Sequence, residues 1–329
     1  MQKKSRRFLL LLPLVASIGV IGAAHAQANA YPSKPITVVV AYPPGGDTDA
    51  MARLFADRLS SKLKQTVLIE NKPGAGGTVG NAQVGKAKPD GYTLLFTPNP
   101  FTTAPFVLPV SPGNRYDVLN GFEPIIKTAT QPLVLVSHPQ AGPRSLQDMI
   151  SQLKEGKTLS YASPGAGSPM HIAAEWLNKE AGVNADHVPY RGVGPSVTDV
   201  VGGHVQTAWV TLGPVMQYFA EGKLTPLAIA DAQRSKLAPD IPTLQEQGIK
   251  NVVVGSWNGF FAPKGTPKEI VNLLNKHLND IVHQPDVVQK MAVFGAEPAG
   301  GAPAVLGQTN ADEYKVMGAL IKELGIRAE

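Results

Sequence analysis

Three glycine-rich loops carry the residue types best suited to binding a small anion. They have the sequences Pro-Pro-Gly-Gly-Asp-Thr-Asp at 43–49, Gly-Ala-Gly-Gly-Thr at 74–78 and Ser-Pro-Gly-Ala-Gly-Ser at 163–168. Each loop follows an expected strand and precedes an expected helix, whose first N–H groups are unpaired and lie at the positive end of the helix dipole. Glycine lets the backbone approach a ligand closely. These loops favour a carboxylate ligand, although glycine turns of this kind also serve only to reverse the chain.

The candidate ligand contacts in and beside these loops are mostly small or polar residues: Tyr42, Pro44, Gly45, Gly46, Asp49, Gly76, Gly77, Ser163, Gly167 and Ser168. Two further candidates come from the residues nearby. His171 lies three residues after Ser168 and could donate to a ligand, or be an ordinary half-buried histidine. Arg191, in the loop 189–195, could pair with a carboxylate, or be a solvated loop arginine.

Motifs of enzymes and metal sites are missing from the sequence. No loop ends in Gly-Lys-Ser/Thr, and the second loop is too short and misplaced to bind a dinucleotide. The seven histidines show no metal-ligand spacing, and the chain has no cysteine. We therefore expect no catalytic residue, metal or cofactor. A periplasmic hydrolase that uses Ser163 or Ser168, with His171 as the base, is the less favoured alternative, because glycine does not follow Ser168 as it does in an esterase motif.

The elements that must position these loops alternate short β-branched runs with longer helical patterns. Strands are expected at 36–40, 67–70, 92–96, 133–136, 159–162, 187–190, 205–209, 227–230, 251–254 and 259–262. Helices are expected at 50–63, 79–86, 145–153, 169–181, 196–201, 268–291 and 310–324. This order predicts an α/β fold with mostly parallel sheets, in which ligands bind beyond the carboxyl ends of the strands.

The first 26 residues have the features of a cleavable signal peptide. Four basic residues precede an apolar run over 8–24, and the cleavage motif Ala-His-Ala follows at 24–26. A membrane anchor is the alternative, but Pro13 and the lack of a charged flank favour cleavage before Gln27. We therefore expect export to the periplasm. A partial twin-arginine motif leaves open whether export follows that route or the Sec route.

Charge and length bound the class of protein. The chain has 30 Lys+Arg and 25 Asp+Glu, and four of the basic residues lie in the leader, so the mature chain is almost neutral. Since it also lacks a basic patch, we expect no nucleic-acid partner. Without cysteine there are no disulfides, yet about 300 residues suffice for a sizeable core and predict about two domains.

Several short motifs follow one another in an order found in one known family. They are Tyr-Pro-Ser-Lys-Pro-Ile at 31–36, Pro-Pro-Gly-Gly at 43–46, Glu-Asn-Lys-Pro-Gly-Ala-Gly-Gly at 70–77, Lys-Pro-Asp-Gly-Tyr-Thr-Leu-Leu at 88–95, His-Val-Pro-Tyr-Arg-Gly at 187–192, Gly-Lys-Leu at 222–224, Ile-Pro-Thr-Leu at 241–244 and Phe-Ala-Pro-Lys-Gly-Thr-Pro at 261–267. Together they resemble the Bug family, the extracytoplasmic receptors of tripartite tricarboxylate transporters. The resemblance covers nearly the whole mature chain.

This resemblance implies a type II periplasmic-binding-protein fold, in which two lobes joined by two crossing strands enclose a ligand cleft. Lobe 1 would comprise residues 27–127 plus 252–329, and lobe 2 residues 128–251. The family also implies that lobe 2 binds a small carboxylate at the loop 163–168, and that lobe 1 approaches it through the loops at 43–46 and 74–77, often through water. By the same comparison Asn99 and Thr211 fall in the cleft.

The resemblance further implies that membrane permease subunits are the protein partners, and we expect the receptor to be a monomer. A sensor that feeds a two-component kinase is an open alternative. Val210 stands where many family members carry Asp, which argues against an amino-acid ligand. Trp209 beside it suggests an apolar or aromatic mono- or dicarboxylate, unless Trp209 is only a core residue.

Overall fold

The computed structural model describes residues 31–327, and the chain from Pro32 onward forms one compact unit. The expected signal peptide lies outside the described residues, so its cleavage stays a prediction. Among the residues that are described, no helix combines the length and the apolar composition needed to cross a membrane.

Six strands form the first sheet, in the order β11-β4-β10-β3-β1-β2. β1 pairs in parallel with β2 and β3, whereas β10 runs antiparallel to β3 and β4. Apolar β-branched and aromatic side chains fill its core, where the rings of Phe96 and Phe260 have centroids 4.7 Å apart. The strands are β1 (Ile36–Val40), β2 (Val67–Asn71), β3 (Thr93–Pro98), β4 (Phe122–Gln131), β10 (Ser256–Pro263) and β11 (Glu297–Pro298).

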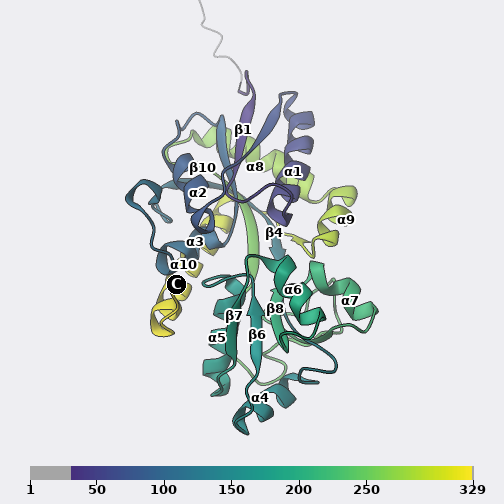
Figure 1. Cartoon of the computed structure of the whole chain (residues 1–329). Coiled ribbons are helices and arrows are strands. Elements are labelled where there is room, and N and C mark those ends of the chain that lie inside the picture. Colours follow the sequence, from purple (N-terminus) through teal and green to yellow (C-terminus); the bar gives the residue numbers. More distant parts are fainter. Residues whose placement is uncertain (1–30, 328–329) are drawn as a thin grey trace, which may run out of the picture. The chain divides into compact units, whose positions relative to one another are not determined.

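Helices from both ends of the chain pack around this sheet (Figure 1). They are α1 (Asp47–Leu63), α2 (Thr78–Gly85), α3 (Pro100–Val107), α8 (Lys268–Val282), α9 (Pro285–Val293) and α10 (Pro303–Glu323), with short 3-10 turns η1 (Ala75–Gly77) and η2 (Pro112–Asn114). The C-terminal helical region is therefore three helices, because Pro285 starts a new helix and Pro303 starts α10 earlier than residue 310.

Five strands form the second sheet, in the order β7-β6-β8-β5-β9. β6 pairs in parallel with β7 and β8, and β5 runs antiparallel to β8 and β9. The strands are β5 (Leu133–Ser137), β6 (Ser160–Ser163), β7 (Asp186–Pro189), β8 (Thr207–Thr211) and β9 (Thr225–Ile229). The helices are α4 (Leu146–Lys154), α5 (Pro169–Ala181), α6 (Val193–Val201) and α7 (Met216–Ala220), and the 3-10 turn is η3 (Gly213–Val215).

The chain crosses between the two sheets twice. It passes from β4 directly into β5, and it returns into β10 after residues 251–254. These residues were expected to be a strand but form none, and Val252 and Val254 instead pack into the core of the second sheet. The expected two-lobe α/β fold is confirmed, but the sheets, which were expected to be mostly parallel, are mixed, because the crossing strands run antiparallel to their neighbours.

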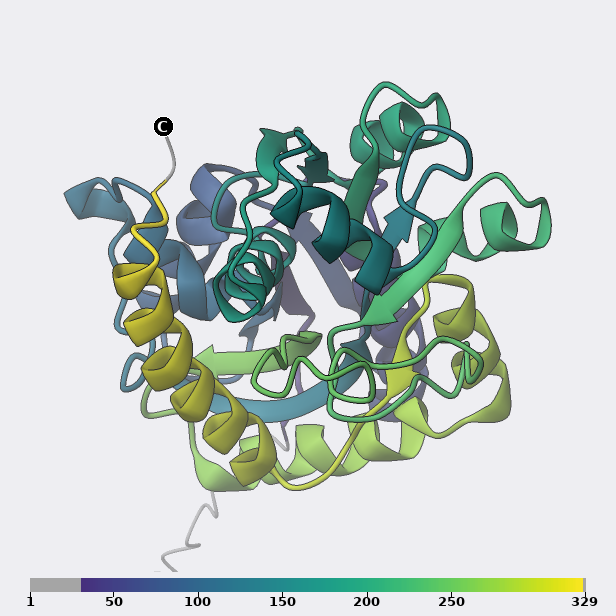
Figure 2. The ribbon, with the colours of Figure 1, turned by 90° about the horizontal axis from the view of Figure 1, so that it is seen from below.

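We call the first sheet with its helices the first lobe, and the second sheet with its helices the second lobe. The exact boundaries expected for the lobes, 27–127 plus 252–329 and 128–251, stay a prediction. Helix α10 lies beside α3 and β4 of the first lobe (Figures 1 and 2). Its C-terminal side chains, Leu320 and Ile321 among them, join the apolar core of the second lobe. Trp209 is in that core and is 1% exposed, so it is a core residue.

Candidate functional site

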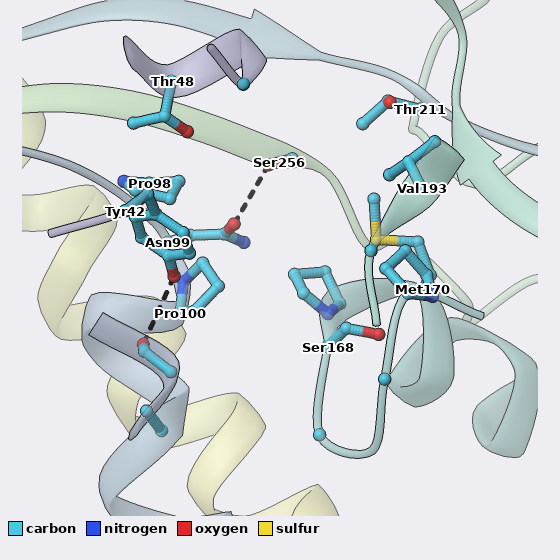
Figure 3. A pocket seen from close by; sticks show the side chains of 18 of the residues that line it. Tyr42, Thr48, Pro98, Asn99, Pro100, Ser168, Met170, Val193, Thr211 and Ser256 are labelled. Carbon is cyan, nitrogen blue, oxygen red and sulfur yellow. Dashed lines mark hydrogen bonds between the residues drawn. The ribbon is translucent and has the colours of Figure 1, made fainter. Parts of the chain in front are cut away.

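A cavity of about 650 Å³ lies where loops of the two lobes face one another. Eight of the sequence-predicted residues line it: Tyr42, Gly46, Gly76, Asn99, Gly167, Ser168, Arg191 and Thr211. Six others do not: Pro44, Gly45, Asp49, Gly77, Ser163 and His171. Figure 3 shows two groups of side chains facing each other across the space, with Tyr42, Thr48 and Asn99 in one group and Ser168, Met170 and Thr211 in the other.

On the first lobe, the loop after β1 and the loop after β2 are joined by the phenol of Tyr42. Its hydroxyl donates to the carbonyl oxygen of Gly76 at 3.2 Å (Figure 3). Burial raises the pKa of Tyr42 well above its ordinary value, so the phenol stays a neutral donor. The contact fixes the two glycine loops against each other at the edge of the cavity.

Asp49 shapes the first loop from behind and does not face the cavity. Its carboxylate accepts hydrogen bonds from the backbone N–H of Gly45 at 2.9 Å, from Arg53 at 3.0 Å and from Asn71 at 2.8 Å. Burial acts to raise the pKa of Asp49, but the hydrogen bonds from Arg53, Gly45 and Asn71 outweigh it and the pKa is lowered. Asp49 is therefore a structural anion that holds the loop in place.

Asn99 directly follows β3 and links three parts of the chain at the cavity wall. Its amide nitrogen donates to the carbonyl of Gly255 at 3.0 Å and to Glu313 at 2.8 Å, and its amide oxygen accepts from Ser256 at 3.1 Å (Figure 3). The other oxygen of Glu313 accepts from the indole of Trp257. Burial raises the pKa of Glu313 to about 7, although these hydrogen bonds act in the opposite direction. Both hydrogens of the Asn99 amide are thus already used.

On the second lobe, the N-termini of α5 and α6 both meet the cavity. Ser168 caps α5, because its hydroxyl accepts from the N–H of His171 at 3.2 Å, and Pro169 takes the first helical position. α6 begins directly after Gly192. Neither helix has an acidic residue in its first turn, so both positive dipole ends are unneutralised by their own side chains.

Two polar side chains of this lobe are free to meet a ligand. Arg191 is exposed, and no hydrogen bond or ion pair of its guanidinium occurs within the described part of the chain. The hydroxyl of Thr211 is buried and has no hydrogen-bond partner among the described residues. A buried unpaired hydroxyl costs free energy, which a ligand oxygen would recover.

The histidine predicted to contact the ligand is packed behind the loop 163–168. His171 accepts from the N–H of Gly167 at 2.9 Å, and its ring stacks on His187 with centroids 3.9 Å apart. Burial lowers the pKa of His171 to about 3 and that of His187 to about 4, so both rings are neutral. Ser163 lies 2.6 Å from the Nε2 atom of His187 but is fully buried. The pair therefore supports the loop from inside.

The described residues contain no cluster of three histidine, cysteine or acidic side chains that could hold a metal ion. Sequence reasoning missed two residues that matter at the cleft. Asp47, the first residue of α1, lines the cavity. Glu313 comes from α10, more than two hundred residues from its partner Asn99, and no local pattern marks it.

Comparison with known proteins shows which family the chain belongs to. The protein-family model described as the tripartite tricarboxylate transporter family receptor matches residues 51–326. The chain belongs to this receptor family. BugT of Bordetella pertussis is 35% identical over 316 residues, which cover 95% of each chain.

Two solved structures show the same fold as this receptor. The periplasmic binding protein BugD matches with a TM-score of 0.76 and 32% identity over 90% of this chain and 100% of that one. MatC from Rhodopseudomonas palustris, solved with bound malate, matches with a TM-score of 0.76 and 31% identity over 88% of this chain and 100% of that one. The receptor is thus similar along almost its whole described length to solute-binding proteins.

Proposed function

We propose that the protein is a periplasmic receptor that captures a small carboxylate between its lobes and delivers it to the permease of a tripartite tricarboxylate transporter. The observation that carries this proposal is the set of groups that the second lobe presents to the cavity. Two helix N-termini without acidic residues, the unpaired guanidinium of Arg191 and the unpaired hydroxyl of Thr211 all meet one cavity. These groups suit an anion with several oxygen acceptors.

The ligand side of the proposal also draws on a relative. MatC, at 31% identity, was solved with malate, a small dicarboxylate. Binding requires no covalent chemistry, because backbone N–H groups, one hydroxyl and one guanidinium can hold a carboxylate as it is. Ser163 is fully buried and does not line the cavity, so its position supports a binding role over hydrolysis.

Delivery by closure of the lobes is the second part of the proposal. A receptor that closes around its ligand presents a surface that differs from the open form, and a permease can recognise that surface. We also propose that the protein acts as a monomer after its signal peptide is removed. Sedimentation of the exported protein, and sequencing of its N-terminus, would test these two points.

The direct test is calorimetric titration of protein purified from the periplasm of an expression host. Mono-, di- and tricarboxylates would be compared with their neutral amides. We expect at least one carboxylate to bind and its amide not to bind. A hundredfold excess over the Kd should also stabilise the folded protein by about 3 kcal/mol, a rise in Tm of several degrees.

Arg191→Gln supplies the matched variant. Arg191 has no partner to lose, so the fold should be unaffected, and carboxylate affinity should fall roughly five- to tenfold. Arg115→Gln removes the same charge from an exposed position outside the cavity and should leave affinity unchanged. Binding of the amides as tightly as the acids would refute the carboxylate proposal.

A further inference from the structure

The cavity carries one charged group of each sign, and the two belong to different lobes. Among the described lining residues, Asp47 of α1 is the one carboxylate and Arg191, between β7 and α6, is the one guanidinium. No hydrogen bond or ion pair of either side chain occurs within residues 31–327, so they do not neutralise each other. A ligand that fills the cavity meets both.

The helix N-termini around the cavity differ between the two lobes in the same way, with acidic residues on the first lobe only. α1 has two acidic residues in its first turn, Asp47 and Asp49, which already neutralise the positive end of its dipole. α5 and α6 on the opposite lobe have none. A carboxylate is therefore favoured at the second lobe and disfavoured at the N-terminus of α1.

An independent observation also favours the second lobe as the place for an anion. Thr211, on the last position of β8, is 5% exposed and its hydroxyl lacks a partner among the described residues. Figure 3 shows Thr211 on the same side of the cavity as Ser168 and Val193. The unpaired donor thus lies on the lobe that also supplies Arg191 and the two acid-free helix ends.

Much of the lining is apolar, and its polar residues between the lobes, such as Ser256, are uncharged. Pro98, Pro100 and Leu108 come from the first lobe, and Met170 and Val193 come from the second. Such a lining accommodates an aliphatic or ring-shaped body, and apart from Asp47 and Arg191 it offers no charged partner. The charged groups of a well-matched ligand would therefore stand at its two ends.

Asp47 lacks the hydrogen bonds that stabilise the charge of Asp49. Burial raises the pKa of Asp47, and no hydrogen bond from the protein acts in the opposite direction. Asp49 is the more buried of the two, yet three donors hold its pKa below the ordinary value. Asp47 is thus a half-buried carboxylate at the cavity without the partners that stabilise the charge of Asp49.

We propose that Asp47 makes the cleft selective for a carboxylate that carries a protonated amine at its far end, and that it disfavours a second carboxylate there. This inference rests on the proposed function, because it assumes that the second lobe holds a carboxylate. It concerns a distal ammonium. The α-ammonium of an ordinary amino acid would lie beside the carboxylate, near the second lobe, where no acidic side chain lines the cavity.

The test compares three ligands with the same carbon chain and different far ends: δ-aminovalerate with an ammonium, valerate with a methyl group and glutarate with a second carboxylate. Calorimetry on the wild-type receptor should give the tightest binding for δ-aminovalerate and the weakest for glutarate. Shorter and longer homologues of each ligand allow for the unknown length of the cleft, and the preference for the ammonium should hold at the length that binds best.

Asp47→Asn should lower the affinity for the ammonium ligand and raise it for the dicarboxylate, so that the ratio of their Kd values changes at least tenfold. Asp240→Asn removes one negative charge from an exposed position outside the cavity and should leave that ratio unchanged. Arg191→Gln should weaken all three ligands together.

The outcomes separate this inference from the proposed function. If dicarboxylates bind more tightly than ammonium carboxylates to the wild type, and Asp47→Asn leaves their ratio unchanged, the role of Asp47 is refuted while carboxylate binding stands. The wild-type order alone decides the matter if the variant fails to fold. If no acid of any length binds, the proposed function itself fails.

Discussion

Two buried threonines share an unpaired hydroxyl, but one of the two lines the cleft and the other does not. The hydroxyls of Thr211 and Thr103 are both buried without a hydrogen-bond partner in the described residues, but Thr211 lines the cavity and Thr103 does not. If Thr211 donates to the ligand, Thr211→Val should weaken binding by about 1 kcal/mol, roughly fivefold, without loss of stability. Thermal melts and calorimetry measure the two effects separately.

Thr103→Val is the matched control, because it removes an equally unpaired hydroxyl elsewhere in the first lobe. It should leave ligand affinity unchanged and should not destabilise the protein. Equal affinity of the Thr211→Val variant and the wild type would show that this hydroxyl makes no contact with the ligand.

Glu313 should make stability depend on pH near neutrality. Its pKa rises from an ordinary 4.5 to about 7 because the carboxyl is buried, so the folded state binds more protons than the unfolded state between these values. Its contribution is fully present below pH 4.5 and is lost as pH rises through 7. A shift of this size corresponds to roughly 3 kcal/mol. Glu313→Gln should remove this dependence, so that its Tm falls less than that of the wild type between about pH 5 and about pH 8.

The informative quantity in that experiment is the difference in Tm between the wild type and the Glu313→Gln variant. His171 and His187 have pKa values lowered to about 3 and about 4, and they act in the opposite direction, since they destabilise the folded state as pH falls below 6.5. Their effect is common to wild type and variant and cancels in the difference. Parallel Tm curves would contradict the assignment of a raised pKa to Glu313.

Single residues show where sequence reasoning reaches its limit. The glycine loops could be predicted to lie at the cleft, because strand and helix patterns place them beyond the carboxyl ends of strands. The direction of each side chain could not. Asp47 and Asp49 lie two positions apart on a helix, so one faces the cavity and the other turns inward, and their order depends on where the sheet lies. His171, on α5, stacks on His187, which comes from β7 and is distant in the local sequence pattern.

At the scale of elements, the loop before α5 packs tightly on α3 of the other lobe. Gly167 has a φ of +74°, and a Cβ atom built on it would lie 2.3 Å from Cγ1 of Val107. Gly167→Ala would therefore strain the loop and force the two lobes apart at this point. We expect a loss of ligand affinity of about tenfold or more, measured by calorimetry.

The double variant Gly167→Ala with Val107→Ala separates the effect of the clash with Val107 from the effect of the strained backbone. Shortening Val107 relieves the clash but leaves the strain of a positive φ, so the double variant should recover part of the lost affinity. Val107→Ala alone serves as the reference. Strictly additive losses would indicate that the approach of α3 to this loop does not govern binding.

Elements were predictable where their signals are local. The strands of β-branched residues and the start of α5 at Ser168-Pro169 follow from composition and capping. Residues 251–254 carry the same β-branched pattern but pack as an irregular segment, because their side chains fill the core of the second lobe. Pro303 at the start of α10 is a helix signal that follows two glycines, and it marks the boundary better than apolar spacing does.

At the scale of the whole molecule, the two lobes are joined by more than the crossing segments. The C-terminal end of α10 packs into the second lobe, and Lys179 of α5 pairs with Glu323 at the end of α10. Gly213 and Gly295 bring the backbones of the two lobes so close that a Cβ atom on Gly295 would lie 2.1 Å from the nitrogen of Gly213. These contacts could not be predicted from the sequence, because they depend on how the lobes face each other.

The place of β10 between β3 and β4 also has a consequence for the order in which the chain acquires its structure. The first sheet needs residues 256–263 at its centre, whereas all five strands of the second sheet lie within residues 133–229. One core of the second lobe is built entirely from residues between Val134 and Ile241. When the chain emerges N-terminus first, the early strands of the first lobe still lack β10. The edge of β3 therefore stays unpaired while the second lobe can already form. Pulse-labelling hydrogen exchange during refolding should protect the amides of β5 and β8 before those of β3 and β10, and simultaneous protection would show that the two lobes form as one unit.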